Sequence, residues 1–129
     1  MTPELLALTL AVLLQGAQFV LYSALAQKQV GTKYAASPRD APRQLTGTAG
    51  RAQRALNNHF ESLALFTPAV LVITLADKST AFTAACAWVY LAARLLYVPA
   101  YLMGWAPGRS LIWVAGFLAT MALPLAALI

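Results

Sequence analysis

The sequence carries little charge for its length. Only 10% of its 129 residues are Asp, Glu, Lys or Arg, whereas 60% are hydrophobic. A soluble domain has charge on about a quarter of its residues, so this composition excludes a soluble globular protein. Because a polypeptide crosses a bilayer as helices when it is made of long apolar segments, the chain is predicted to be an all-α integral membrane protein.

Several kinds of site are missing. The single cysteine, Cys86, leaves no intrachain disulfide to form, and we expect it to serve only in packing. There is no metal-ligand set, Gly-rich phosphate loop or Ser/His/Asp grouping, so no metal site is predicted. No basic residue precedes Lys28, and we therefore expect the first apolar segment to be retained rather than cleaved as a signal peptide.

The positive charge is concentrated in one segment. The net charge is +5, and the basic residues between positions 28 and 54 are Lys28, Lys33, Arg39, Arg43, Arg51 and Arg54, against the single acid Asp40. An excess of basic residues beside membrane spans indicates which side of the membrane a loop occupies. We therefore expect membrane lipids, and not nucleic acid, as partners. The positive-inside rule places the loop in the cytoplasm and both termini on the periplasmic or lumenal side.

The apolar segments predict one domain, residues 1–129, built as a four-transmembrane-helix bundle. The expected spans are about 3–27, 50–76, 81–103 and 109–129, joined by the basic loop 28–49 and two short turns. The second and third spans should form an antiparallel hairpin, because only a few polar residues separate them.

A polar motif opens the second span. Arg54, Asn58 and Glu61 are spaced i, i+4 and i+7, which places them on one face of a helix. Glu61 would lie near the hydrocarbon boundary, where an ionisable group costs about 2.5–3.5 kcal/mol on insertion scales. Such a residue indicates a functional site.

A second motif lies on the third span. Arg94, Tyr97 and Tyr101 also share one helical face. Counting outward from the hairpin turn places Glu61 opposite Arg94, Asn58 opposite Tyr97, and Arg54 opposite Tyr101, while Arg109 enters the fourth span at the same end. Two interpretations stay open: a buried Glu61–Arg94 ion pair that only fixes helix packing, or a site for a small zwitterion with more than one carboxylate.

Three further polar residues lie within or beside the predicted spans. Gln15 and Gln18 share a face of the first span, and we expect hydrogen bonds between helices rather than a ligand or lumen role. His59 lies one position off the motif face, so we expect it at the membrane interface or facing the loop rather than acting as a base.

Together, the motifs Arg54-x-x-x-Asn58-x-x-Glu61 and Arg94-x-x-Tyr97-x-x-x-Tyr101 resemble those of the membrane-associated proteins in eicosanoid and glutathione metabolism, the MAPEG family. Residues 89–97 are similar to the leukotriene C4 synthase branch, and residues 106–110 to the microsomal prostaglandin E synthase branch.

The resemblance implies a homotrimer that binds glutathione at subunit interfaces and transfers it to lipophilic small molecules. It implies that glutathione is held by Arg51, Arg54, Asn58, Glu61, Arg94, Tyr97 and Tyr101. It assigns thiolate stabilisation to Arg109, with Ser110 beside it. For so short a chain it further implies a bacterial protein of the inner membrane.

The favoured interpretation is therefore a glutathione S-transferase or peroxidase-type enzyme. The alternative is a non-catalytic subunit of the same fold that acts as a scaffold or accessory in a larger membrane complex. A small four-span exporter ranks last, because its usual carboxylate in the middle of the first span is absent and only Glu4, at the edge, is present.

Overall fold

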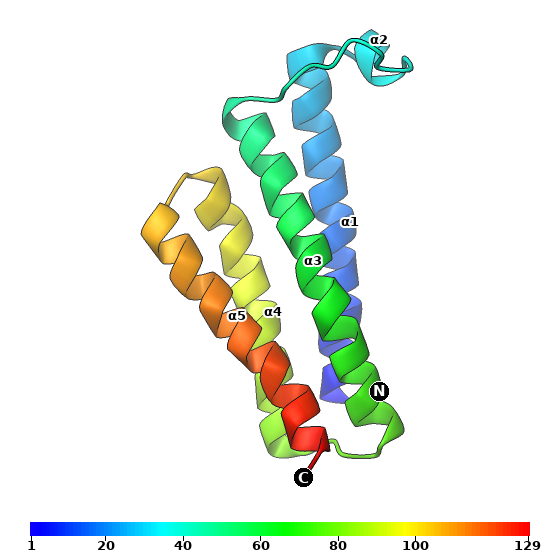
Figure 1. Cartoon of the computed structure of the whole chain (residues 1–129), viewed down its shortest axis with the longest axis vertical. Coiled ribbons are helices and arrows are strands. Elements are labelled where there is room, and N and C mark those ends of the chain that lie inside the picture. The colour runs from blue at the N-terminus through cyan, green and yellow to red at the C-terminus, as the bar shows by residue number, and fades with distance from the viewer.

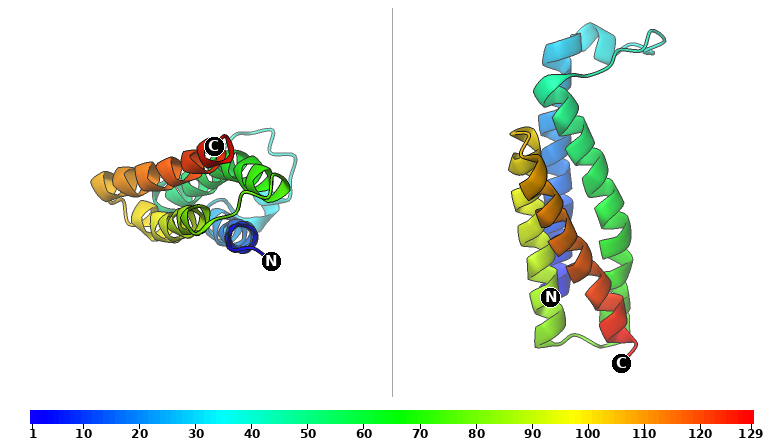
Figure 2. Two further views of the ribbon diagram at one scale, coloured as in Figure 1. Left: turned by 90° about the horizontal axis from the view of Figure 1, so that it is seen from below. Right: turned by 60° about the vertical axis from the view of Figure 1, so that its left-hand side comes forward.

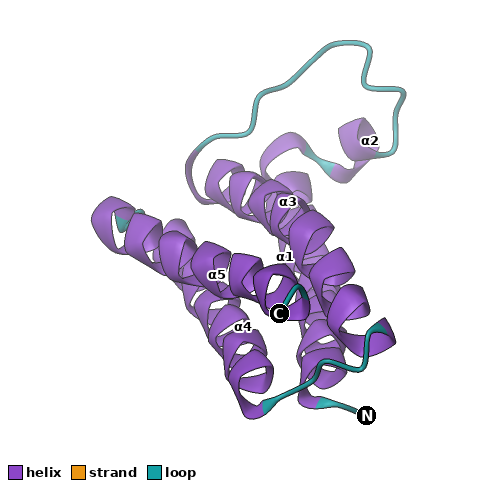
Figure 3. Ribbon diagram, turned by 60° about the horizontal axis from the view of Figure 1, so that its bottom comes forward, coloured by secondary structure: helices purple, strands orange, loops and turns teal.

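The computed structural model describes all of residues 1–129 and consists of helices and loops, with no strand (Figures 1 and 3). The helices are α1 (Pro3–Val30), α2 (Thr32–Ala35), α3 (Gly47–Leu75), α4 (Ala81–Leu102) and α5 (Ala106–Ala127). The four predicted membrane helices are thus confirmed. The one-turn helix α2 was not predicted, and it lies within the basic loop.

The helix ends follow from local chemistry. Thr2 caps α1 by accepting the Leu5 amide proton at 3.3 Å, and Pro3 occupies the first turn, where its missing N–H has no cost. Gly31 ends α1 at φ +89°, a backbone conformation that favours glycine. Thr80 and Thr83 form a reciprocal capping box at the start of α4.

The long helices alternate in direction, so the chain has two distinct ends. Both termini and the α3–α4 turn lie at one end, and the basic loop and the α4–α5 turn lie at the other, called here the loop end (Figure 1). Helix α1 packs chiefly against α3, and α4 packs chiefly against α5, as the views in Figure 2 show. The α4–α5 pair leans away from the other two helices toward the loop end.

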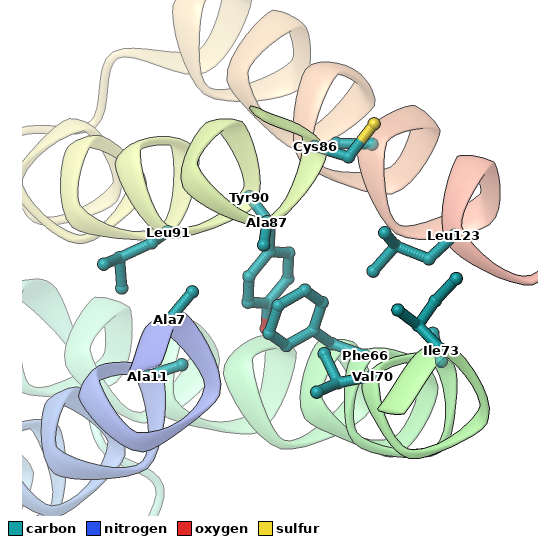
Figure 4. Close-up of a cluster of buried hydrophobic side chains, with 12 residues drawn as sticks. Ala7, Ala11, Phe66, Val70, Ile73, Cys86, Ala87, Tyr90, Leu91 and Leu123 are labelled. Carbon is teal, nitrogen blue, oxygen red and sulfur yellow. The ribbon is translucent and has the colours of Figure 1, made fainter. Parts of the chain in front are cut away.

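The apolar core lies toward the end that holds the termini (Figure 4). Phe66 of α3 stacks on Tyr90 of α4 with ring centroids 3.7 Å apart, and Ile73 and Leu123 are fully buried beside them. Gly116 of α5 faces α4 so closely that an added Cβ would lie 3.2 Å from the Ala93 Cβ. Small residues at such crossings let membrane helices approach and pack.

The outer surface suits a bilayer. Large apolar side chains are exposed along all four long helices, including Leu13 and Val20 on α1, Leu75 on α3 and Leu118 on α5. Each of these helices is long and apolar enough to cross a membrane. The chain is an integral membrane protein.

The two glutamines inside α1 are buried, but their hydrogen bonding differs from the prediction. Gln15 and Gln18 are buried as expected, but neither amide has a hydrogen-bond partner within the chain, so the predicted interhelical bonds are not made. Helix α1 packs chiefly against α3, and the residues that α3 buries near its start include Ala52, Ala55 and Leu56, which have no polar side-chain atoms.

Candidate functional site

The motif residues meet in an open cavity at the loop end, called here the outer cavity. Its volume is about 480 Å³, and it is bounded by α3, α4 and α5. Seven of the nine residues predicted for the site line it: Arg54, Asn58, Glu61, Tyr97, Tyr101, Arg109 and Ser110. Three helices therefore bring their polar faces together, as the motif spacing predicts.

Arginines and tyrosines in the outer cavity contact one another closely. Arg54 Nε donates to Tyr101 Oη at 3.2 Å, so the predicted pairing of these residues is confirmed. The Arg109 guanidinium lies 4.5 Å from the centre of the Tyr101 ring, and Tyr97 meets the same ring edge-on at 5.5 Å. Cation–π contacts of this kind hold two positive charges in place without neutralising them.

Glu61 supplies the negative charge of the outer cavity. Its side chain is exposed and forms no ion pair or hydrogen bond within the chain. The ion pair considered for Glu61 and Arg94 is therefore not formed. Arg94 Nη1 instead donates to Asn58 Oδ1 at 2.9 Å, one helical turn nearer the loop end. The pairing of Glu61 with Arg94 would hold if α3 and α4 ran side by side along their whole length from the hairpin turn. Instead, the α4–α5 pair leans away from α3.

Two predicted residues do not line the outer cavity. Arg51 points toward the end of α4, where its Nε donates to the Leu102 carbonyl at 2.8 Å and its Nη2 to Thr48 Oγ at 3.4 Å. It thereby ties α3 to α4 at the rim of the site. Arg94 lies deeper in the bundle and lines a second cavity.

This second space, called here the inner cavity, has a volume of about 130 Å³ and lies between α3, α4 and α5 on the core side of the outer cavity. Glu61 and Trp113 line both cavities, so the two adjoin. Apolar residues form much of its wall, including Leu65, Ile112 and Phe117. A polar cavity and an apolar one thus share a boundary at a carboxylate.

His59 was expected at the interface or facing the loop, and that expectation is wrong. The side chain is fully buried between α1 and α4. Its Nδ1 accepts a hydrogen bond from Arg94 Nε at 3.4 Å, and its Nε2 lies 3.0 Å from the Ala11 carbonyl oxygen, to which it donates. Both bonds require the neutral ring protonated at Nε2. The burial of His59 could not be predicted from the spacing of side chains, because its partner on α1 is a backbone oxygen.

The start of α5 positions Arg109 and Ser110. The Trp105 ring lies over Gly108, where an added Cβ would come within 2.5 Å of it, so only glycine fits before Arg109. Ser110 Oγ donates to the Ala106 carbonyl at 3.3 Å, which leaves its oxygen free to accept. The local fold therefore directs both side chains into the outer cavity.

The motif did not identify every lining residue. Asn57, Trp113 and Val114 also line the outer cavity. Trp113 lies in the wall of both cavities. Its spacing of four from Arg109 on α5 is the signal that could have selected it.

Comparison with known proteins identifies the family of the chain. The MAPEG family matches residues 5–129, nearly the whole chain. Neither the comparison with curated proteins nor the one with solved structures gave a match. With four membrane helices and a match of this extent, the chain belongs to the MAPEG family.

Proposed function

We propose that this protein binds glutathione in the outer cavity and activates its thiol to react with lipophilic electrophiles, as a glutathione S-transferase or peroxidase-type enzyme. Membership of the MAPEG family, whose members generally use glutathione, supports this class of activity. The observation that carries the proposal is the exposed, unpaired Glu61 beside two arginines in one cavity.

The charges of the outer cavity complement those of glutathione. Glutathione carries two carboxylates, one ammonium group and a neutral thiol at pH 7. Arg54 and Arg109 supply positive charge for the carboxylate oxygens or the thiolate sulfur, and Glu61 supplies the acceptor for the ammonium group. Asn58, Tyr97 and Tyr101 add polar atoms along the peptide.

Arg109 is assigned to the thiol. A free thiol has a pKa near 8.5 and is only a few per cent thiolate at pH 7. Lowering that pKa by about two units requires about 2.7 kcal/mol of preferential stabilisation of the thiolate. A nearby guanidinium in a partly desolvated cavity is able to supply it. Ser110, the next residue, is assigned a hydrogen bond to the reacting group.

The electrophile would arrive from the bilayer, because the adjoining inner cavity is largely apolar. We further propose that the protein is a homotrimer in a bacterial inner membrane, with the basic loop cytoplasmic and both termini periplasmic. The six basic residues of positions 28–54 support this orientation. In this orientation the outer cavity faces the cytoplasm, where glutathione is available.

Isothermal titration of glutathione into the purified protein in detergent tests the proposal. The wild type should bind, and Glu61→Gln should weaken binding by about tenfold or more, because the ammonium group loses its ionic acceptor. Arg43→Gln, on the loop outside the outer cavity, is the matched control and should bind like the wild type. No binding at millimolar glutathione would refute the enzymatic proposal and favour the non-catalytic scaffold.

A further inference from the structure

A third cavity, called here the loop cavity, is formed by the basic loop and the helices beside it. Its volume is about 170 Å³, and it is bounded by α1, α2, the loop that follows α2, and α3. It has no lining residue in common with the outer or the inner cavity. The space admits a group much larger than a water molecule, and the proposed glutathione chemistry does not use it.

The charge of the loop cavity is purely positive. Arg39 and Arg43 line it, and no Asp or Glu does, because Asp40, the one acid of the loop, lies outside the wall. The outer cavity, by contrast, has Glu61 beside its arginines. An ammonium group would therefore find an acceptor in the outer cavity and none in the loop cavity. The loop cavity suits an anion that carries no cationic group.

Both guanidinium groups are held in place by the chain and keep donors free. Arg39 Nε and Nη2 donate to the Ala35 carbonyl at 3.0 and 2.7 Å, and Arg43 Nη1 donates to the Val30 carbonyl at 3.1 Å. The Arg43 guanidinium also lies 4.5 Å from the centre of the Tyr34 ring. Both side chains are exposed, and Arg39 Nη1 and Arg43 Nη2 make no hydrogen bond within the chain. A phosphate group, with its several acceptor oxygens, matches two such guanidinium groups.

The loop that carries these arginines is fixed by side-chain hydrogen bonds. Tyr34 Oη donates to the Ala41 carbonyl at 2.7 Å and accepts from the Arg43 backbone amide at 3.0 Å. Gln29 of α1 holds both backbone groups of Thr46, donating to its carbonyl at 3.0 Å and accepting from its amide at 2.8 Å. Because the chain itself positions the loop, less conformational entropy is lost when a ligand binds.

The place of the loop cavity along α1 indicates the source of the anion. A helix of 28 residues is about 42 Å long, whereas the hydrocarbon layer is about 30 Å thick, so about eight residues extend beyond it. The polar residues Gln27, Lys28 and Gln29 place this extension at the loop end (Figure 1). Ser23, Gln27 and Val30 line the cavity from the same stretch. The cavity therefore lies at the level of the headgroups, where the phosphate groups of phospholipids are found.

We propose that the loop cavity binds the phosphate group of an anionic membrane phospholipid, with Arg39 and Arg43 donating to its oxygens. The apolar part of the wall, which includes Ala26, Val30 and Leu45, contacts the glycerol and the first acyl carbons. The bound lipid holds the basic loop against the membrane surface. This site does not depend on glutathione, so its test is separate from that of the proposed function.

Calorimetry with short-chain lipids, on the full-length protein in a non-ionic detergent, tests the proposal. Dihexanoyl phosphatidylglycerol should bind saturably. Dihexanoyl phosphatidylcholine has the same chains and phosphate but adds a cationic group, and it should bind about tenfold more weakly or less. Glycerol phosphate, which has the phosphate and no chains, should also bind about tenfold more weakly, because it buries no apolar surface. Equal affinity for the two lipids would refute the anion site, and equal affinity for glycerol phosphate would refute the lipid as its source.

Charge variants separate the cavity from the loop as a whole. Arg43→Gln should weaken phosphatidylglycerol binding by about tenfold or more. Lys33→Gln removes the same charge from α2 but not from the cavity wall, and it should change the affinity by less than about threefold. Equal losses would mean a general attraction between the loop and anionic lipid, and the proposed site would be wrong.

A second variant covers the contacts that Arg43 makes within the loop. Arg39→Gln leaves the bonds of Arg43 with Val30 and Tyr34 intact, and it should also weaken phosphatidylglycerol binding by about tenfold. If Arg39→Gln binds the lipid like the wild type, then Arg43→Gln acts by loosening the loop, and the proposal of a two-arginine phosphate site fails.

Discussion

The two ends of the bundle each contain one glutamate, and their surroundings differ. At the end that holds the termini, Glu4 is fully buried and accepts hydrogen bonds from Ser79 at 2.9 Å and Thr83 at 2.6 Å. At the loop end, Glu61 is exposed in the outer cavity and accepts none. The chain satisfies one carboxylate with its own hydroxyl groups and leaves the other without a partner.

The difference shows how to separate structural polar groups from functional ones in a membrane protein. A polar group close to the hydrocarbon carries a free-energy cost, and a group whose partners all belong to the chain offsets that cost by joining helices. Glu4 does so by linking α1 to the α3–α4 turn and to α4. Glu61 has no such partners, which is why it, and not Glu4, is placed in the proposed site.

The largest expected effect is on stability at the Glu4 end. Glu4→Ala removes the acceptor for the Ser79 and Thr83 hydroxyls and should lower the free energy of unfolding by about 1.5–3 kcal/mol. Denaturant unfolding in detergent, followed by far-ultraviolet circular dichroism, measures it. Glu61→Gln, a change at the exposed carboxylate, should leave the unfolding midpoint at the wild-type value. If Glu61→Gln destabilises the protein as much as Glu4→Ala does, the two carboxylates do not differ in role.

A smaller effect is expected within the outer cavity. Tyr101→Phe removes the hydroxyl that accepts from Arg54 and keeps the ring that faces Arg109. Freed from this bond, Arg54 should hold glutathione less well, and the Kd should rise by about twofold to tenfold. The kcat should stay near the wild-type value, because the contact of Arg109 with the ring remains. A large fall in kcat with an unchanged Kd would contradict this division of roles.

The sequence predicted the long helices and most of the residues that line the outer cavity. Apolar runs of membrane length fix α1, α3, α4 and α5, and the i, i+4 and i+7 spacing of Arg54, Asn58 and Glu61 fixes which face holds the polar groups. The partner of Arg94 depended on how far α4 leans from α3, which the hairpin turn does not determine. The burial of His59 depended on a backbone oxygen of α1, and the inner cavity on how α5 packs against α4, so neither was predictable from side-chain spacing.

The central claim is that the outer cavity converts the glutathione thiol into a thiolate through Arg109. The most direct test is the ultraviolet absorbance of the thiolate, titrated against pH with glutathione bound to saturation. A lowered thiol pKa means that the absorbance appears at lower pH in the wild type than in free glutathione. In Arg109→Gln, saturated with glutathione, the absorbance should appear only at the higher pH of the free thiol. Coincident titrations of the two proteins, or a wild-type titration that matches free glutathione, would contradict the account.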